Sequence, residues 1–261
     1  MRSTLHFHSA LLMLVATIHA EEALPPRTVA DEVALLGKGR IRAQQNALAR
    51  LAAHTDPEAD IVLLAQFARY RAGELPAALW LDLFEAAAKR DNAALKAALA
   101  ERERELEKVK DASARYRECL AGGDADAGRA IFTKKAEAGC VRCHAVDGKG
   151  GQIGPELTWH RHTTERAHLL ESLIVPSATM AAGYQCALLK LKSGEEISGV
   201  LTGENAGELT LTSVGDGKKR TLKIAEIAER TPLPSLMPPH FGAVLSKRDI
   251  RDLIEFLAEG D

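Results

Sequence analysis

The sequence predicts a mainly α-helical protein that carries a small antiparallel β unit late in the chain. Helical periodicity runs from about residue 30 to residue 110, in a segment dominated by Ala and Leu. Between about 184 and 230, apolar residues instead alternate with a period of two, and a final amphipathic pattern closes the chain. The chain has 261 residues, of which 46% are hydrophobic, so it can build one or two domains with ordinary cores.

Residues that start and stop helices divide the first half of the chain. Helices are predicted over 41–53, 57–70, 77–89 and 93–110. Asp56-Pro57 supplies an N-cap and a first-turn proline, Gly73 ends that helix, and Asn92 caps the last one. These look like paired antiparallel helices of the HEAT-like kind, which bury their faces by stacking on neighbours. Because two pairs are few for such an array, we expect a HEAT-like module over 21–120 that leans on the next domain or on a partner.

The second half of the chain begins with short helices around a Gly-rich loop. The helices are predicted over 126–134 and about 164–173, and the loop over 139–154. The period-two segments then predict antiparallel strands at 187–191, 197–201, 209–212 and 221–224. Ser246 and Asp249 form a capping box, so a closing helix with an apolar stripe is predicted from there.

The N-terminus predicts export from the cytoplasm. Met1 and Arg2 give a positive start, residues 10–18 are apolar, and small residues approach Ala20 ahead of Glu21. The apolar run is shorter than the ~20 residues that span a bilayer. We therefore expect a signal peptide over 1–20, with an uncleaved N-terminal anchor as the alternative. No later stretch is apolar enough to span a membrane, so the mature chain is expected in the periplasm.

Composition argues against nucleic-acid binding and leaves the cysteines to be explained. The formal net charge of −2 gives no basic footprint of the kind that nucleic-acid binders need. In an oxidising compartment, thiols are seldom left without a role. Cys119 and Cys186 could form a disulfide if their Cα atoms approach within about 7 Å.

The residues Cys140-Val141-Arg142-Cys143-His144 carry the chemistry of this sequence. They form the C-x-x-C-H pattern of c-type haem attachment. Two thiols three positions apart can add to the two vinyl groups of one porphyrin, and the histidine that follows can coordinate the iron. A thioredoxin-like motif would need a strand before it, and a zinc site would need a second ligand pair. A plain disulfide would leave His144 without a role.

Residues 124–257, about half of the chain, resemble the haem-binding cytochrome c domain of large exported proteins from planctomycetes and verrucomicrobia. In that family, HEAT-like helices often precede the haem domain. The resemblance implies a class I cytochrome c domain over 121–261, with the β unit at about 184–230 as an insertion and one covalent haem c. The matching stretches are Gly128-Arg129-Ala130-Ile131-Phe132, Cys140 through His144, Gly154-Pro155-Glu156-Leu157, Leu169-Leu170-Glu171-Ser172, Gly183-Tyr184, Ser235-Leu236-Met237-Pro238 and Asp252-Leu253-Ile254-Glu255-Phe256-Leu257.

The resemblance also implies roles for single residues. Gly128 and Phe132 would pack against the last helix at Leu253 and Phe256, and the Pro155 carbonyl would accept a hydrogen bond from His144. Met237 would be the sixth ligand opposite His144, and Met/His ligation raises the reduction potential. Met180 and His240 are the competing candidates for that position.

These expectations together describe an electron carrier and no enzyme. The haem would exchange single electrons with redox proteins such as a periplasmic dehydrogenase or another cytochrome, and the helical module would dock one of them. A haem-based sensor or small-ligand-binding protein is the alternative, and it would show an open or easily displaced sixth position. A peroxidase is a third possibility, although such enzymes usually carry a second haem or a catalytic distal group. One C-x-x-C-H motif supports neither feature.

Overall fold

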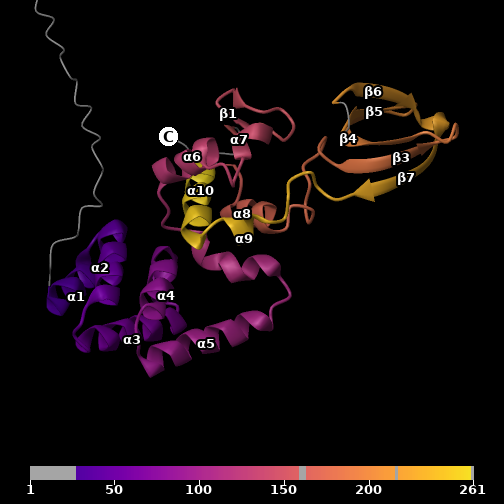
Figure 1. Cartoon of the computed structure of the whole chain (residues 1–261). Helices are drawn as coiled ribbons and strands as arrows, with labels where there is room; N and C mark the ends of the chain where they lie inside the picture. Colours follow the sequence, from indigo (N-terminus) through magenta and orange to yellow (C-terminus); the bar gives the residue numbers. More distant parts are fainter. Residues whose placement is uncertain (1–27, 159–162, 215–216, 260–261) are drawn as a thin grey trace, which may run out of the picture.

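The computed structural model describes residues 28–158, 163–214 and 217–259. Figure 1 shows a helical module, a second helical unit stacked against it, and a β unit that projects to one side. The prediction of a mainly α fold with a small antiparallel sheet is confirmed at this level. Within the described ranges, no helix is long and apolar enough to cross a membrane. The predicted signal peptide over 1–20 lies outside the described residues.

The helical module packs its helices around one apolar cluster, made mostly of Leu and Ala. Its elements are α1 (Val29–Lys38), α2 (Ile41–Ala53), α3 (Glu58–Arg71), the 3-10 turn η1 (Ala77–Leu79), α4 (Trp80–Ala88) and α5 (Ala93–Glu107). Tyr70 meets both Trp80 and Phe84 edge-to-face inside this core. Asn92 caps α5 as predicted, and the Asp56 carboxylate accepts a hydrogen bond from the backbone at the start of α3.

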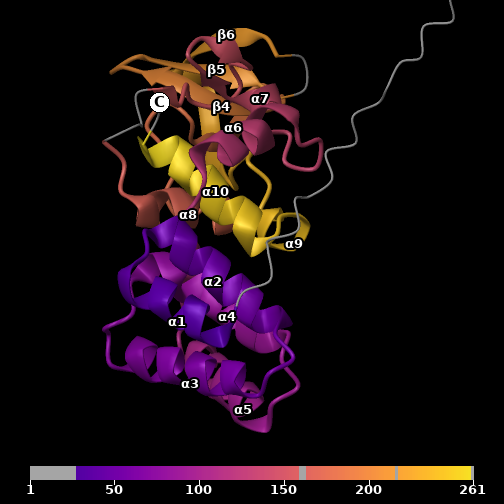
Figure 2. The same cartoon turned by 90° about the vertical axis from the view of Figure 1, so that its left-hand side faces the viewer.

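The second unit gathers short helices from both ends of the remaining chain. Its elements are η2 (Ala112–Cys119), α6 (Ala125–Lys134), α7 (Cys140–Cys143), β1 (Ala145–Val146), β2 (Lys149–Gly150), α8 (Arg166–Ile174), α9 (Phe241–Val244) and α10 (Lys247–Glu259). The predicted capping box begins α10, because the Ser246 hydroxyl and the Asp249 carboxylate each bind the other's backbone amide. Figure 2 shows α6 lying across α10.

The crossing of α6 and α10 depends on a glycine. A Cβ on Gly128 would lie 2.0 Å from the carbonyl oxygen of Asp252, so any larger residue would push the two backbones apart. Phe132 and Phe256 pack beside this point, with ring centroids 5.8 Å apart. The two helices therefore make the contact that the resemblance implies for Gly128 and Phe132.

The β unit is a five-stranded antiparallel sheet in the order β6-β5-β4-β3-β7. Its strands are β3 (Cys186–Leu191), β4 (Glu196–Glu204), β5 (Glu208–Ser213), β6 (Lys219–Lys223) and β7 (Ile227–Leu233). The first four match the predicted strands, whereas β7 was not predicted. β7 is an edge strand that is mostly exposed and contains Glu229, Arg230 and Pro232, so it lacks apolar alternation.

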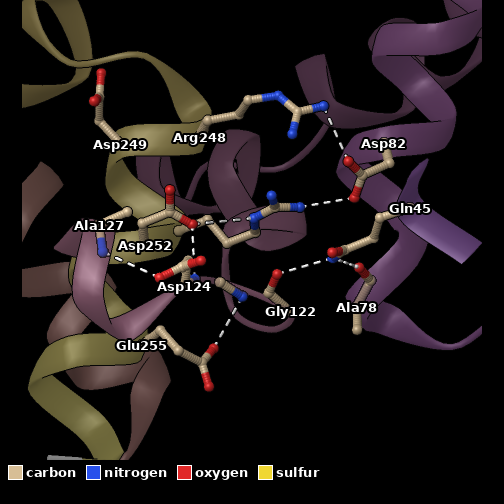
Figure 3. Close-up of polar contacts among 12 residues, drawn as sticks. Gln45, Ala78, Asp82, Gly122, Asp124, Ala127, Arg248, Asp249, Asp252 and Glu255 are labelled. Carbon is tan, nitrogen blue, oxygen red and sulfur yellow. Dashed lines mark hydrogen bonds and ion pairs between the residues drawn. The ribbon is translucent and has the colours of Figure 1, made fainter. Parts of the chain in front are cut away.

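Buried charges join the helical module to the second unit, as Figure 3 shows. Asp82 of α4 and Arg251 of α10 have side chains only 2% exposed, and their charged atoms lie 2.7 Å apart. Arg248 extends the cluster, because it donates to Asp82 at 3.0 Å and to Glu85 at 2.6 Å. Ion pairs thus attach the helical module to the second unit. Such an attachment is expected for a module with so few helices.

A second buried carboxylate, on η2, links the same two parts. The side chain of Glu118 is 2% exposed, and it accepts hydrogen bonds from Arg102 of α5 and Lys247 of α10, both at 2.6 Å. Gln45 of α2 adds a hydrogen bond to the carbonyl of Gly122 at 2.8 Å, visible in Figure 3. The junction between the two helical parts is therefore polar, and its charged groups are paired.

Candidate functional site

The C-x-x-C-H motif forms a single helical turn followed by an extended residue. α7 begins after Gly139, whose φ of 58° is in the left-handed region that glycine tolerates. The His144 amide donates to the Cys140 carbonyl at 2.9 Å and closes the turn. Because positions three apart in a helix lie on one face, Cys140 and Cys143 point to the same side. Both cysteines are half-buried.

A small hairpin, β1-β2, follows the motif within the predicted Gly-rich loop. Its two-residue turn is Asp147-Gly148, with φ values of 53° and 69°. Asp-Gly is a typical sequence for such a turn, so this pair was a usable signal that the sequence analysis missed. The Thr158 hydroxyl accepts from the Asp147 amide at 2.5 Å and donates to the Glu156 carboxylate. Thr158 therefore ties the hairpin to the segment that approaches His144.

The loop after the hairpin wraps closely around the motif. The Gly151 amide donates to the Val141 carbonyl at 2.9 Å, and the Gly154 amide donates to the Cys143 carbonyl at 2.8 Å. A Cβ on Gly154 would lie 2.5 Å from Cε1 of His144. The His144 ring therefore packs directly on the Gly154 backbone, which leaves no room for a side chain.

The orientation of the His144 ring is fixed by the next residue of this loop. Nδ1 of His144 lies 2.9 Å from the carbonyl oxygen of Pro155. A carbonyl can only accept, so Nδ1 carries the proton in this hydrogen bond, and the lone pair of the ring is on Nε2. A histidine that ligates a metal is commonly held in this way by its other nitrogen.

The electrostatic setting of the motif differs from that of a thiol-exchange enzyme. Burial, together with the neighbouring Cys143, raises the pKa of the Cys140 thiol to about 11. Thioredoxin-like catalysis requires the opposite shift, because the thiolate is the nucleophile. The chain before α7 is also a turn rather than a strand.

The competing candidates for the sixth ligand occupy different settings. Met237, between β7 and α9, is half-buried and packs on the same apolar cluster as Cys140. Met180 is half-buried in the segment between α8 and β3. His240 is exposed and its ring contacts Phe241 at a centroid distance of 5.1 Å. Met237 is thus the candidate that shares a core with the C-x-x-C-H motif.

The remaining cysteines are buried in separate parts of the molecule. Cys119 belongs to the apolar cluster of the second unit, and burial raises the pKa of its thiol to about 12. Cys186 begins β3. All four cysteines in the chain are free thiols in the structure, so the possible Cys119–Cys186 disulfide is not formed.

Two further observations concern the site: its capacity to hold a metal ion and its similarity to known proteins. Among the described residues, no group of three or more His, Cys, Asp or Glu side chains is arranged to hold a metal ion. The chain matches no protein-family model, and no curated protein matches it.

Proposed function

We propose that Cys140 and Cys143 hold one haem covalently and that His144 ligates its iron. The observation that carries the proposal is the setting of His144: Nδ1 is bound to the Pro155 carbonyl at 2.9 Å and the ring packs on Gly154. This setting places the proton on Nδ1 and the lone pair on Nε2, which is the nitrogen that would ligate the iron. When bound, the haem supplies reversible one-electron exchange at its iron.

The proposed architecture of residues 121–261 is a class I cytochrome c domain interrupted by the β unit. The close crossing of α6 and α10 at Gly128 supports it, as does the loop that carries Pro155 to His144. The partly buried apolar side chains of Cys140, Val141 and Leu157, which pack on one core, support it as well. A porphyrin is large and apolar, and such a surface suits it.

Met237 is the proposed sixth ligand. Its thioether is a soft donor that suits haem iron, and it packs on the core that also contacts Cys140. His240 is exposed and Met180 is not part of that core, so both are weaker candidates. A Met/His pair would favour the reduced iron and raise the reduction potential.

The proposed role is one-electron transfer between exported redox partners, with no catalytic step in this chain. A periplasmic dehydrogenase or another cytochrome would be the partner, and the helical module would dock it. The buried ion pairs of Asp82 and Glu118 support this arrangement, because they attach the module to α10 and η2 of the unit that carries the motif. Export by a cleaved signal peptide predicts a periplasmic form that begins near Glu21.

Electron exchange and carbon monoxide binding test the role. The reduced haem protein is expected to pass its electron to oxidised periplasmic carriers and to bind carbon monoxide poorly. The matched variant Met237→Ala should bind carbon monoxide readily, since it opens the sixth position. Tight carbon monoxide binding by the unaltered protein, without electron exchange, would instead favour a haem-based sensor or ligand-binding protein.

A further inference from the structure

The β unit joins the rest of the molecule at one place. β3 begins at Cys186 and β7 ends at Leu233, and these two residues are paired across the sheet. The chain therefore enters and leaves the β unit side by side, which Figure 1 shows as two adjacent connections to the helices. Met237 lies in the second of these connections, between β7 and α9, so the base of the sheet comes shortly before the proposed sixth ligand.

The segment that carries Met237 is fastened by hydrogen bonds. The Ser235 amide donates to the Ser177 hydroxyl at 3.1 Å, and Ser177 belongs to the other connection, between α8 and β3. The Met237 amide donates to the Ser235 hydroxyl, also at 3.1 Å. Leu236 is 45% exposed, so apolar burial of that residue contributes little to holding the segment.

Cys186 supplies a second fastening from the sheet. The residue is 4% exposed, and its thiol contacts two backbone groups. The sulfur lies 3.8 Å from the Tyr184 carbonyl, to which the S–H donates. Burial raises the pKa of this thiol, and a hydrogen bond from the Leu236 backbone opposes that shift. A thiol can donate and accept at once, whereas alanine can do neither.

We propose that Ser177 and Cys186 are positioning residues for Met237, and that the β unit holds the sixth ligand in place at its base. The inference rests on the proposed function, because it presumes that Met237 ligates the haem. A loop ligand is displaced when its segment moves, so hydrogen bonds that fix the segment favour the ligated state. Loss of one such bond, worth about 1 kcal/mol, would raise the displaced population roughly fivefold.

The experiment uses the full haem-loaded protein and its variants Ser177→Ala, Cys186→Ala and Cys186→Ser. Two readouts report on Met237. The first is the weak far-red absorption band that methionine ligation would give the oxidised haem protein, and the second is the carbon monoxide affinity of the reduced protein. Each alanine variant should weaken the band and raise the affinity roughly fivefold, and the double variant roughly 25-fold if the bonds act independently. Cys186→Ser should keep most of the band strength and the low carbon monoxide affinity of the parent protein, because a hydroxyl also donates and accepts.

Matched controls separate positioning from general destabilisation. Ser198→Ala changes a serine of β4 whose side chain has no hydrogen bond among the described residues, and Cys119→Ala removes a buried thiol of the helical core. Neither should alter the band or the affinity. Amide hydrogen exchange gives a readout that does not depend on the haem: Leu236 and Met237 should exchange faster only in the Ser177 and Cys186 alanine variants.

The outcomes distinguish this inference from the proposed function. If Met237→Ala abolishes the band but Ser177→Ala, Cys186→Ala and the double variant leave band, affinity and exchange unchanged, the positioning role is wrong and the haem assignment stands. If Met237→Ala leaves the band intact, Met237 is not the ligand, and the inference fails together with that part of the proposed function.

Discussion

The helical module meets the second unit across buried charges, whereas the β unit meets it through two strand ends. At the junction with the module, Asp82 of α4 pairs with Arg251 of α10 and Arg102 of α5 pairs with Glu118 of η2, and both carboxylates are nearly inaccessible. On the β side, the described core of the sheet draws only on residues 187–227. Both neighbours thus have apolar cores of their own, but the module is also joined to the second unit by buried ion pairs.

This difference suggests that the module contributes to the stability of the second unit, whereas the β unit adjusts the segment that carries Met237. Removing one partner of a buried ion pair strands the other charge, so the module and the second unit should unfold as one cooperative body. A unit that has its own core and is attached only through two strand ends can lose structure locally while the rest persists. The β unit can then influence the Met237 segment without destabilising the helices. Asp82→Ala and Leu211→Ala test this contrast, and two further substitutions test contacts within the second unit.

The largest expected effect is that of Asp82→Ala. It removes the nearer partner of the buried Arg251, which then has only Asp252 at 3.7 Å, so the free energy of unfolding should fall by about 3–5 kcal/mol, measured by urea denaturation. Glu101→Ala is the matched control, because it breaks the Arg71–Glu101 pair, whose side chains are 53% and 48% exposed. That change should cost less than about 1 kcal/mol. Equal losses would contradict a special role for the buried pair.

Leu211→Ala should destabilise the β unit and little else. Leu211 is fully buried in the core of the sheet, and such a truncation costs about 2–5 kcal/mol. Hydrogen exchange should accelerate in β3 to β7, while the amides of α6 and α10 keep their protection. Acceleration that spread equally through the helices would show that the β unit is not independent.

Gly128→Ala should weaken the crossing of α6 and α10. The new Cβ would lie 2.0 Å from the Asp252 carbonyl, so the helices must separate, and the expected loss of stability is about 1–3 kcal/mol. Gly37→Ala provides the control, since a Cβ there meets nothing within 4 Å and α1 should gain slightly from alanine. A harmless Gly128→Ala would contradict the tight crossing.

The smallest effect is a pH dependence at the start of α10. Burial alone would raise the pKa of Asp249, but hydrogen bonds from Ser246 and Lys135 outweigh it and hold that pKa below its usual value of 3.8. The folded state therefore binds fewer protons than the unfolded state. The contribution is present above the unfolded pKa and is lost as the pH falls through the folded one.

Asp249→Asn checks this sign. Stability measured between about pH 2.5 and pH 6 should fall less steeply on acidification in the variant than in the parent protein. Lys135→Ala should reduce the slope partially, because the Ser246 hydrogen bonds remain. A steeper slope in Asp249→Asn would reverse the assignment.

Short sequence patterns predicted those features that depend only on neighbouring residues, such as helix starts. Asn92 and the Ser246–Asp249 capping box place helix starts correctly, because a cap satisfies backbone amides within one turn. The C-x-x-C-H motif is likewise local, and its turn is closed by residues of the motif itself. The strands with clear alternation of apolar and polar residues were also predicted, because that pattern is contained within one short segment.

Contacts between distant segments were beyond such signals. Asp82 and Arg251 are 169 positions apart, and no local sequence pattern near either residue predicts that they pair. One clue was present: Lys247, Arg248 and Arg251 lie near the start of α10, where the helix dipole disfavours positive charge. Their placement indicates a partner elsewhere. The contact of Gly154 with the His144 ring also depends on a loop path that no periodicity encodes.

The most direct test of the account is covalent haem in protein produced with periplasmic haem-maturation machinery. Haem stain after denaturing electrophoresis is expected for the parent protein and for the matched control Cys119→Ala, and not for a Cys140→Ala, Cys143→Ala double variant. The optical spectrum of the native protein should change reversibly on reduction. Parent protein without covalent haem under these conditions would contradict the central claim and return Cys140 and Cys143 to a zinc site or a disulfide.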